Sequence, residues 1–530
     1  MSVEVSTVFT IILVFIICLL TMLSKKLKVA YPIILVLAGL LLSFVPSMPR
    51  IEINPERIFI LVLPPLLYEA ALTISWKELC RWRRIISCFA FIVVFVTACS
   101  VAFVANHFIP GFSIALGFLL GGIVSPPDAV SAQAIMGFVK VPKRFSTVIE
   151  GESLFNDASS LIIMKFALIA IGTGQFVWYE AAGSFVWMIA GGVGVGVLVA
   201  WLLRQFHRFF NTDVNIDVVL TLIIPYVMYL TAEGVEASGV IAVVSGGLYM
   251  NSHNYKIYSS SSRLSARNVW SNFGFLLNGI VFLIIGLDLP EIVATIEADG
   301  ISIVTATGYG LLITAALIVV RLLCAYGALA VTMVMRNFIN VADPNYYGLK
   351  APLILGWTGM RGVVSLAAAL SIPLTITSQG WPFPERSMII YITFIVILVT
   401  LLLQGLTLPV IIRHTHFPEF HDHIPREEAN KIIRKGMAEV SLNYIRSNTS
   451  CSDVHTSKML QNMVRHWQEQ VDSDASLPLY GPALEVYCQI LHAQRDYLYD
   501  LNKQHPDIDE DVIRHYQYRI DLEEERLKNE

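Results

Sequence analysis

Apolar runs of about 20 residues, the length at which a helix spans the hydrocarbon core of a bilayer, recur along the chain up to residue 412. A soluble protein does not show this pattern. The fold class that we predict is an all-α polytopic membrane protein with about 13 transmembrane helices. We expect the spans at residues 6–23, 29–46, 57–74, 85–106, 112–136, 146–171, 181–203, 214–232, 237–251, 269–287, 301–335, 350–372 and 387–412.

The placement of basic residues indicates the orientation. Lysine and arginine gather after alternate runs, whereas the loops between them, such as residues 288–299, are acidic or neutral. Because basic loops stay in the cytoplasm, we expect the N-terminus outside the cell membrane and the C-terminus inside. The first run has no basic residue before it and no small-residue cleavage site after it, so we interpret it as a retained helix. The basic residues behind the orientation are Lys25, Lys26, Lys28, Arg81, Arg83, Arg84, Lys140, Lys143, Arg144, Arg204, Arg208, Lys256, Arg263, Arg267, Arg336, Lys350 and Arg413.

The chain becomes charged after Arg413, so we divide it into a membrane part, residues 1–413, and a cytoplasmic helical tail, residues 414–530. The sequence leaves open whether the tail regulates the membrane part, binds an unknown regulator, or serves dimerisation or solubility. Helix-like segments of the tail lie at residues 425–447, 454–470, 482–503 and 507–528. The first of them carries an apolar stripe at helical spacing, made of Ile433, Met437, Val440 and Tyr444.

Composition narrows the function classes. Of the 530 residues 55% are hydrophobic and 15% are charged, and the net charge of -4 is too small to suggest a nucleic-acid partner. The 7 cysteines lie in spans or on the expected cytoplasmic side without a CxxC pair, so we expect no disulfide framework. The sequence contains no phosphate loop, nucleophile triad or metal motif, so we predict no enzymatic function and no cofactor.

The run IEGESLFNDASSLIIMKFAL, residues 149–168, carries polar residues inside a predicted span. An ionised side chain at that depth costs at least about 2.5 to 3.5 kcal/mol. Wound as a helix, Ser153 and Asp157 share one face, while Glu152 and Asn156 share the adjacent face. We infer that Glu152 and Asp157 have different functions. The alternative is that both belong to buried ion pairs that lock helices together.

Two other spans are not expected to run as continuous helices. In LLGGIVSPPDAVSAQ, Pro126 and Pro127 remove backbone donors, so the fifth span should open near residues 125–128, beside Asp128. In LGWTGMRGVVSLAAAL, three glycines flank Arg361 and weaken the twelfth span, unless they serve close packing. These are the second-last spans of two six-helix sets of opposite orientation, a pattern that points to a transporter's midplane site. Asp128 can neutralise exposed helix N-termini there, and Arg361 can neutralise C-termini.

Two further ionisable residues lie within predicted spans. Arg321 is too deep to reach either membrane surface, so it requires a carboxylate, and Glu152 is the first candidate. Glu69 follows a double proline in LVLPPLLYEAAL. It belongs either to an ion path or to a helix end near the cytoplasmic interface.

The carboxylate of Asp157 can bind either a proton or a cation, as an exchanger requires. A desolvated carboxylate resists ionisation, so it can exchange protons at cellular pH. Once ionised it is a hard oxygen ligand for sodium. Ser153, backbone carbonyls of the interrupted fifth span and water can complete the coordination. Proton and cation then compete for one carboxylate, which gives antiport. Because Asn156 is neutral and orients the site without carrying charge, we expect one-for-one, electroneutral exchange.

Several stretches resemble the sodium/proton exchanger branch of the monovalent cation:proton antiporters, which includes bacterial NhaP-type proteins and animal sodium/proton exchangers. They appear in family order across the membrane part, and GESLFND is the specific one. The matching stretches are LVLPPLLYEAAL, SPPDAVSAQAI, GESLFNDASS, GVIAVVSGGLYMN, FLLNGIVFLIIGLDL and GWTGMRGVVSLA.

The resemblance implies thirteen helices in inverted repeats, crossed and interrupted helices five and twelve, homodimerisation, and alternating access by movement of a core domain. One departure is that Pro127 precedes and Ala129 follows the helix-five aspartate, where many relatives have threonine or alanine before it and proline after it. The family's site residues fall on Asn156, Asp157, Ser153 and Asp128 for cation and proton binding, on Glu152 and Arg321 for a buried ion pair, and on Arg361 for the second break.

We therefore predict a sodium/proton antiporter that serves sodium transport and pH homeostasis as a homodimer in the lipid bilayer. Two alternatives stay open. The first is an antiporter for potassium or for several alkali cations, because selectivity leaves no motif. The second is a membrane sensor that uses the transporter fold to signal through its tail.

Four histidines stand close together where the tail begins. Such a cluster suits a pH sensor or a metal site. We favour a solvated connector, because a metal site here lacks supporting cysteines and a packed surrounding. The four residues are His414, His416, His421 and His423.

Overall fold

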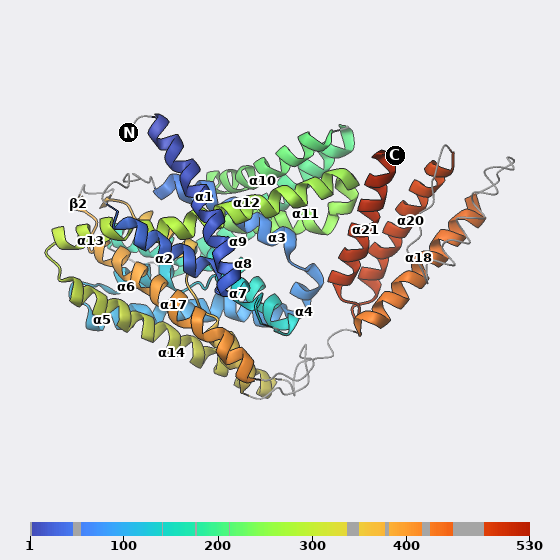
Figure 1. Cartoon of the computed structure of the whole chain (residues 1–530). Coiled ribbons are helices and arrows are strands. Elements are labelled where there is room, and N and C mark those ends of the chain that lie inside the picture. The colour runs from blue at the N-terminus through green and yellow to red at the C-terminus, as the bar shows by residue number, and fades with distance from the viewer. Residues whose placement is uncertain are drawn as a thin grey trace. The chain divides into compact units, whose positions relative to one another are not determined.

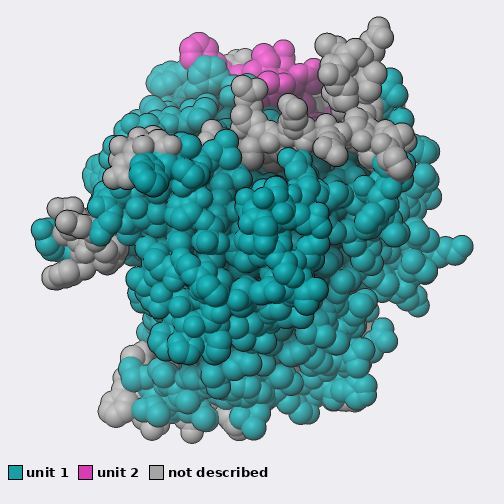
Figure 2. Space-filling view, turned by 90° about the vertical axis from the view of Figure 1, so that its left-hand side faces the viewer, with its two compact units in different colours: residues 1–209, 220–253, 270–417 teal, residues 210–219, 254–269, 418–530 magenta. Residues whose placement is uncertain are grey.

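The computed structural model describes residues 3–45, 55–139, 141–174, 178–210, 212–335, 349–376, 381–415, 424–448 and 482–529. The chain divides into two compact units, which Figure 2 colours separately. Unit 1 comprises residues 1–209, 220–253 and 270–417, and unit 2 comprises residues 210–219, 254–269 and 418–530. Most of the predicted spans therefore belong to unit 1, whereas unit 2 combines the tail with the adjoining ends of α10, α11 and α12, whose bounds follow.

The described chain is almost entirely helical (Figure 1). Two of the predicted spans are each divided into a pair of shorter helices, and a π-helical segment, η1, continues α4 into α5. The elements of the first half are α1 (Val3–Leu27), α2 (Tyr31–Ser43), α3 (Pro55–Thr73), α4 (Trp76–Ser87), η1 (Cys88–Val93), α5 (Val94–Phe108), α6 (Ile114–Val124), α7 (Ala129–Met136), α8 (Lys143–Thr173), α9 (Trp178–Phe209) and α10 (Val214–Gly234).

The second half adds the remaining helices and a small antiparallel hairpin in which Thr375 pairs with Pro382. Its elements are α11 (Gly239–Ile257), α12 (Ser260–Leu287), α13 (Leu289–Ala298), α14 (Ile303–Met335), α15 (Lys350–Trp357), α16 (Val363–Leu370), β1 (Thr375–Ile376), β2 (Trp381–Pro382), α17 (Arg386–Thr415), α18 (Arg426–Asn448), α20 (Pro482–Gln504) and α21 (Glu510–Asn529).

Every predicted span falls on one helix or on two or three consecutive helical elements. In the described part of the chain, eight helical stretches are long and apolar enough to cross a membrane, and two shorter apolar helices accompany them. The chain is thus an all-helical polytopic membrane protein.

One segment differs from the prediction. Residues 288–299 were expected to form an acidic loop, but the structure forms α13 there. Pro290 occupies the first turn of α13, where its missing N–H has no helical partner to lose. Ile292 and Ile296, four residues apart, are buried on one face. The acidic residues on either side of this pair, Glu291 and Glu297, hid the short apolar stripe.

Other predictions fall on residues that the structure does not describe. The predicted tail helix at residues 454–470 lies outside the described residues, and so do His416, His421 and His423. Of the four tail histidines only His414 is described, at the end of α17.

Close contacts hold α6 between α5 and α8. A Cβ atom at Gly117 would lie 2.7 Å from the carbonyl oxygen of Ala102, and one at Gly121 would lie 2.6 Å from that of Ala98. Only glycine permits this approach of α6 to α5. On the side of α8, the hydroxyl of Ser160 donates to the carbonyl of Gly122 at 2.7 Å. These contacts fix the end of α6 beside the polar part of α8.

In unit 2, α18, α20 and α21 pack around an apolar core. Ile433 of the predicted stripe is buried there, and Met437 and Tyr444 pack against the same cluster. Apolar burial therefore joins the three helices. Further core residues are Ala429, Ile490, Leu491, Leu498, Leu501, Ile508, Val512, Ile513, Tyr516, Ile520 and Leu527.

Candidate functional site

The first helix break lies between α6 and α7. Helix α6 ends at Val124 and α7 begins at Ala129, so the proline pair interrupts the span where the sequence predicts. Asp128 caps α7: its carboxylate accepts from the amides of Val130 at 3.0 Å and Ser131 at 3.3 Å, and from the Ser131 hydroxyl at 2.6 Å. A carboxylate in this position offsets the partial positive charge of a helix N-terminus.

The second break lies between α15, which ends at Trp357, and α16, which begins at Val363. The two breaks touch, because the amide of Asp128 donates to the carbonyl of Met360 at 2.7 Å. A Cβ atom at Gly362 would collide with the Asp128 carboxylate. Gly362 thus lets Asp128 approach the N-terminus of α16 as well as that of α7.

Arg361 contacts helix C-termini, whereas Asp128 contacts helix N-termini. Its side chain is completely buried. Its Nε donates to the carbonyl of Val124 at 2.8 Å and its Nη2 to that of Ser125 at 3.4 Å, while Nη1 donates to the carbonyl of Gly359. These carbonyls belong to the C-terminal ends of α6 and α15, which carry partial negative charge.

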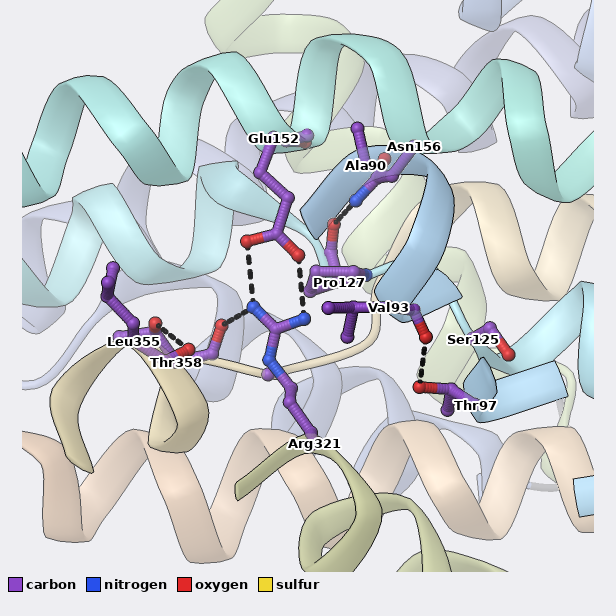
Figure 3. A network of polar contacts seen from close by, with 12 residues as sticks. Ala90, Val93, Thr97, Ser125, Pro127, Glu152, Asn156, Arg321, Leu355 and Thr358 are labelled. Atoms are coloured by element: carbon purple, nitrogen blue, oxygen red, sulfur yellow. Dashed lines mark hydrogen bonds and ion pairs between the residues drawn. The ribbon is translucent and has the colours of Figure 1, made fainter. Parts of the chain in front are cut away.

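A buried ion pair joins α8 to α14 (Figure 3). Arg321 donates through Nη1 and Nη2 to the two carboxylate oxygens of Glu152, at 2.6 Å and 2.8 Å. The side chains are 2% and 1% exposed, respectively. Arg321 also reaches the carbonyl of Thr358 at 3.5 Å. The pair therefore connects α8 to the second break through a bidentate contact between opposite charges. The buried Nε of Arg321 has no hydrogen-bond partner among the described residues.

Helix α8 meets the first break through neighbouring side chains. The Asn156 Nδ2 donates to the carbonyl of Pro127 at 3.0 Å (Figure 3), and the Ser153 hydroxyl accepts from the amide of Ala129 at 3.2 Å. The Asn156 Oδ1 is buried, and no described residue donates to it. An oxygen of this kind is a free acceptor at the break.

Asp157 differs from the other charged residues at the breaks. Its side chain is only 7% exposed. No hydrogen bond or ion pair joins it to another residue in the described part of the chain, whereas Asp128, Glu152, Arg321 and Arg361 all have partners. When these four are ionised, their charges sum to zero, so ionised Asp157 would leave one negative charge inside the protein.

The structure does not bring every predicted residue to the breaks. Glu69 of α3 is half-buried and lies against Gly274 of α12, where a Cβ atom would collide with its carboxylate. No hydrogen bond joins Glu69 to the described residues of the two breaks.

One residue at the second break escaped the sequence analysis. The Thr400 hydroxyl of α17 accepts from the amide of Arg361 at 3.1 Å. The sequence signal was a threonine within the apolar run of the last span, which by itself does not distinguish a site residue from an ordinary buried threonine.

The fold and the site define a class: a helical membrane protein in which two interrupted helices touch beside a buried carboxylate that has no partner in the described part of the chain. Residues 11–414 match the family model of the sodium/hydrogen exchanger, transmembrane. The chain belongs to the sodium/hydrogen exchanger family.

Several characterised or curated proteins resemble the chain. It is 35% identical over 390 residues to the sodium, potassium, lithium and rubidium/H⁺ antiporter of Bacillus pumilus, covering 72% of this chain and 57% of that protein. The protein of the same description from Bacillus subtilis is 32% identical, with 79% and 63% covered. The chain thus spans about three fifths of these two relatives. The low-affinity Na⁺/H⁺ antiporter NhaS1 of Synechocystis is 32% identical, with 72% and 68% covered.

A solved structure has a similar fold. The sodium proton antiporter MjNhaP1 from Methanocaldococcus jannaschii superposes with a TM-score of 0.60 at 18% identity, covering 78% of this chain and 99% of that one. This similarity supports the NhaP-like arrangement of the helices.

Proposed function

We propose that the chain is a sodium/proton antiporter in which a proton and a sodium ion compete for Asp157. The observation that carries this proposal is the isolation of Asp157: it is buried at the meeting point of two helix breaks, and it lacks a partner among the described residues. A buried ionised carboxylate without a partner is costly, so it binds either a proton or a cation.

Neighbouring oxygens suit the cation. Sodium is a hard ion that prefers oxygen ligands. The Asn156 Oδ1 has no donor among the described residues, and Ser153 lies one helical turn from Asp157 on the same face of α8. We propose that these two oxygens and Asp157 bind sodium, with Asp128 close by at the first break and water completing the coordination.

The charges support one-for-one exchange. Two carboxylates and two guanidinium groups at the breaks neutralise one another, so the carrier is neutral when Asp157 holds a proton or a monovalent cation. The empty carrier bears one negative charge, and its crossing costs at least about 2.5 kcal/mol. Empty carriers therefore cross rarely, and exchange is electroneutral.

Alternating access would move the crossed breaks relative to the rest of unit 1. We propose inverted repeats of six helices, because the two interrupted spans are the second-last of each set. The alternation of basic loops supports an external N-terminus and a cytoplasmic tail. A homodimer in the cell membrane, a tail that binds a regulator, and an ion path past Glu69 belong to the same proposal.

A broader cation range is the second candidate. The two Bacillus relatives are described as antiporters of sodium, potassium, lithium and rubidium, whereas the Synechocystis relative is described as a Na⁺/H⁺ antiporter. Comparing rates with the four ions in one assay separates the two candidates.

The test is proton movement in proteoliposomes after addition of sodium, with Asp157→Ala beside the unchanged protein. Exchange should disappear in the variant, and Glu297→Ala, which removes an exposed acid of α13, should exchange normally. An ionophore that clamps the voltage should leave the rate unchanged, because exchange is electroneutral. Undiminished exchange in Asp157→Ala would refute the mechanism, and absence of flux in the unchanged protein would favour the sensor alternative.

A further inference from the structure

Helix α17 carries buried polar side chains on an otherwise apolar helix. Thr393, Thr400 and Gln404 are all completely buried. They are spaced seven and four residues apart, so they share one face. The hydrogen bond from the Arg361 amide to Thr400 shows that this face is directed toward the second break.

The two threonines differ in their second contacts, and the hydroxyl of Thr400 also lies 3.2 Å from the carbonyl of Ile397. Each hydroxyl donates to the carbonyl four residues earlier, Thr393 to Ile389 at 2.8 Å and Thr400 to Val396 at 2.7 Å. A hydroxyl keeps acceptor capacity after it donates. Thr400 uses this capacity to accept from Arg361, whereas Thr393 makes no second hydrogen bond to the residues that the structure describes.

The amide of Arg361 needs this partner. It lies in the non-helical segment before α16, where the helix supplies no carbonyl for it. Gln404 does not replace Thr400 there, because neither of its polar side-chain atoms has a partner among the described residues. The hydroxyl of Thr400 is therefore the group on α17 that satisfies the break.

The position of the Arg361 amide also determines the positions of the end of α6 and of the cap of α7. The side chain of Arg361 holds the carbonyl of Val124 at the end of α6. The preceding residue, Met360, accepts from the amide of Asp128 through its carbonyl. A shift of the backbone at Arg361 would therefore move the cap of α7 and the end of α6 together.

We propose that Thr400 is a positioning residue of the cation site, which holds the two helix breaks in register through the backbone of Arg361. It need not touch the ion, because it acts through Arg361 and Asp128. This inference rests on the proposed antiport function and extends it to a residue of the last span.

The test compares Thr400→Val with Thr393→Val in the full-length protein. Valine keeps the volume of threonine and removes the hydroxyl. In Thr400→Val the buried amide of Arg361 loses its acceptor, and we expect maximal exchange to fall at least about tenfold while the half-saturating sodium concentration rises. Thr393→Val loses only a bond within its own helix and should keep both values near those of the unchanged protein.

Conservative changes separate positioning from packing. Thr400→Ser keeps the acceptor and should restore exchange, and Thr400→Cys, with a weaker acceptor, should lie between serine and valine. This ranking remains measurable if the valine variant does not fold. Equal losses at positions 393 and 400, an impaired serine variant, or normal exchange in Thr400→Val would overturn the inference. None of these outcomes bears on the proposed function, which is tested separately by sodium/proton exchange in the unchanged protein and in Asp157→Ala.

Discussion

Units 1 and 2 each contain a cluster of two arginines and two carboxylates, and the clusters differ in what they bind. In unit 1, Arg361 donates to backbone carbonyls at helix ends, and Asp128 accepts from backbone amides. In unit 2, Asp521 of α21 is shared by Arg263 of α12 and Arg495 of α20, at 3.0 Å in each case. Arg495 also donates to Glu524 at 2.7 Å.

Under the proposed function, this difference distinguishes a structural cluster from one that belongs to the cation site. In unit 2, Asp521 and Glu524 both have arginine partners, so the cluster joins helices and leaves no acid for a ligand. In unit 1 Asp128, Glu152, Arg321 and Arg361 all have partners, whereas Asp157 has none among the residues that the structure describes. We therefore take an acid without a partner among the described residues, beside a neutral cluster, as the mark of the proposed site, rather than the number of charges.

The largest expected effect is on the ion pair of unit 1. Glu152→Gln leaves Arg321 buried without a counter-charge, and we expect about 3 to 5 kcal/mol of destabilisation, measured as thermal unfolding in detergent. Arg321→Gln alone should cost a similar amount. The double change should cost much less than the sum, because neither charge remains unpaired. Additive losses would mean that the two residues do not stabilise each other.

A second prediction addresses the neutrality of the same cluster. Asparagine caps helices about as well as aspartate, so Asp128→Asn should fold. The occupied carrier then bears one positive charge, and its crossing should cost at least about 2.5 kcal/mol, or roughly seventyfold in rate. Proton flux in proteoliposomes measures this, with Glu297→Gln as a control. A rate near that of the unchanged protein would contradict the role of net charge.

Sequence patterns predicted the positions of the helix breaks better than the contacts that the residues make there. Pro126 and Pro127 cannot donate to a helix, so the opening of the fifth span followed from the residues alone. The pairing of Arg321 with Glu152 was a candidate because a buried guanidinium needs a carboxylate. For Arg361 the sequence predicted exposed helix C-termini as partners, but it could not say which carbonyls they would be, because every residue carries one and no motif identifies it.

The role of Thr400 and the presence of α13 could not be predicted, because the sequence signal for each is local and weak. Thr400 looks like any threonine that bonds to its own helix, since its second partner, the amide of Arg361, is defined only by packing. Helix α13 is short, and acidic residues surround its apolar pair, Ile292 and Ile296. Tertiary contacts, rather than periodicity, decide both cases.

A third prediction concerns the cluster of unit 2. Asp521→Asn removes the charge that Arg263 and Arg495 share, but Glu524 still holds Arg495. We expect about 1 to 2 kcal/mol of local destabilisation, seen as faster hydrogen exchange of amides in α20 and α21 of the full-length protein. Antiport activity is not expected to disappear, unlike in Asp157→Ala. If the variant lost sodium/proton exchange while unit 1 stayed folded, the cluster would do more than join helices.

The smallest effect is expected at an exposed pair of unit 2. Lys435 and Glu439 lie one turn apart on α18 with 3.9 Å between the charged atoms, and their side chains are 81% and 61% exposed. Water and salt screen such a pair, so Lys435→Ala should change stability by less than about 0.5 kcal/mol, and high salt should remove the difference. Hydrogen exchange of α18 amides, with Glu439→Ala as the matched control, measures both. If this exposed pair proved as strong as the Asp521 cluster, burial would not determine the strength of these charges, and the contrast between the two units would lose its physical basis.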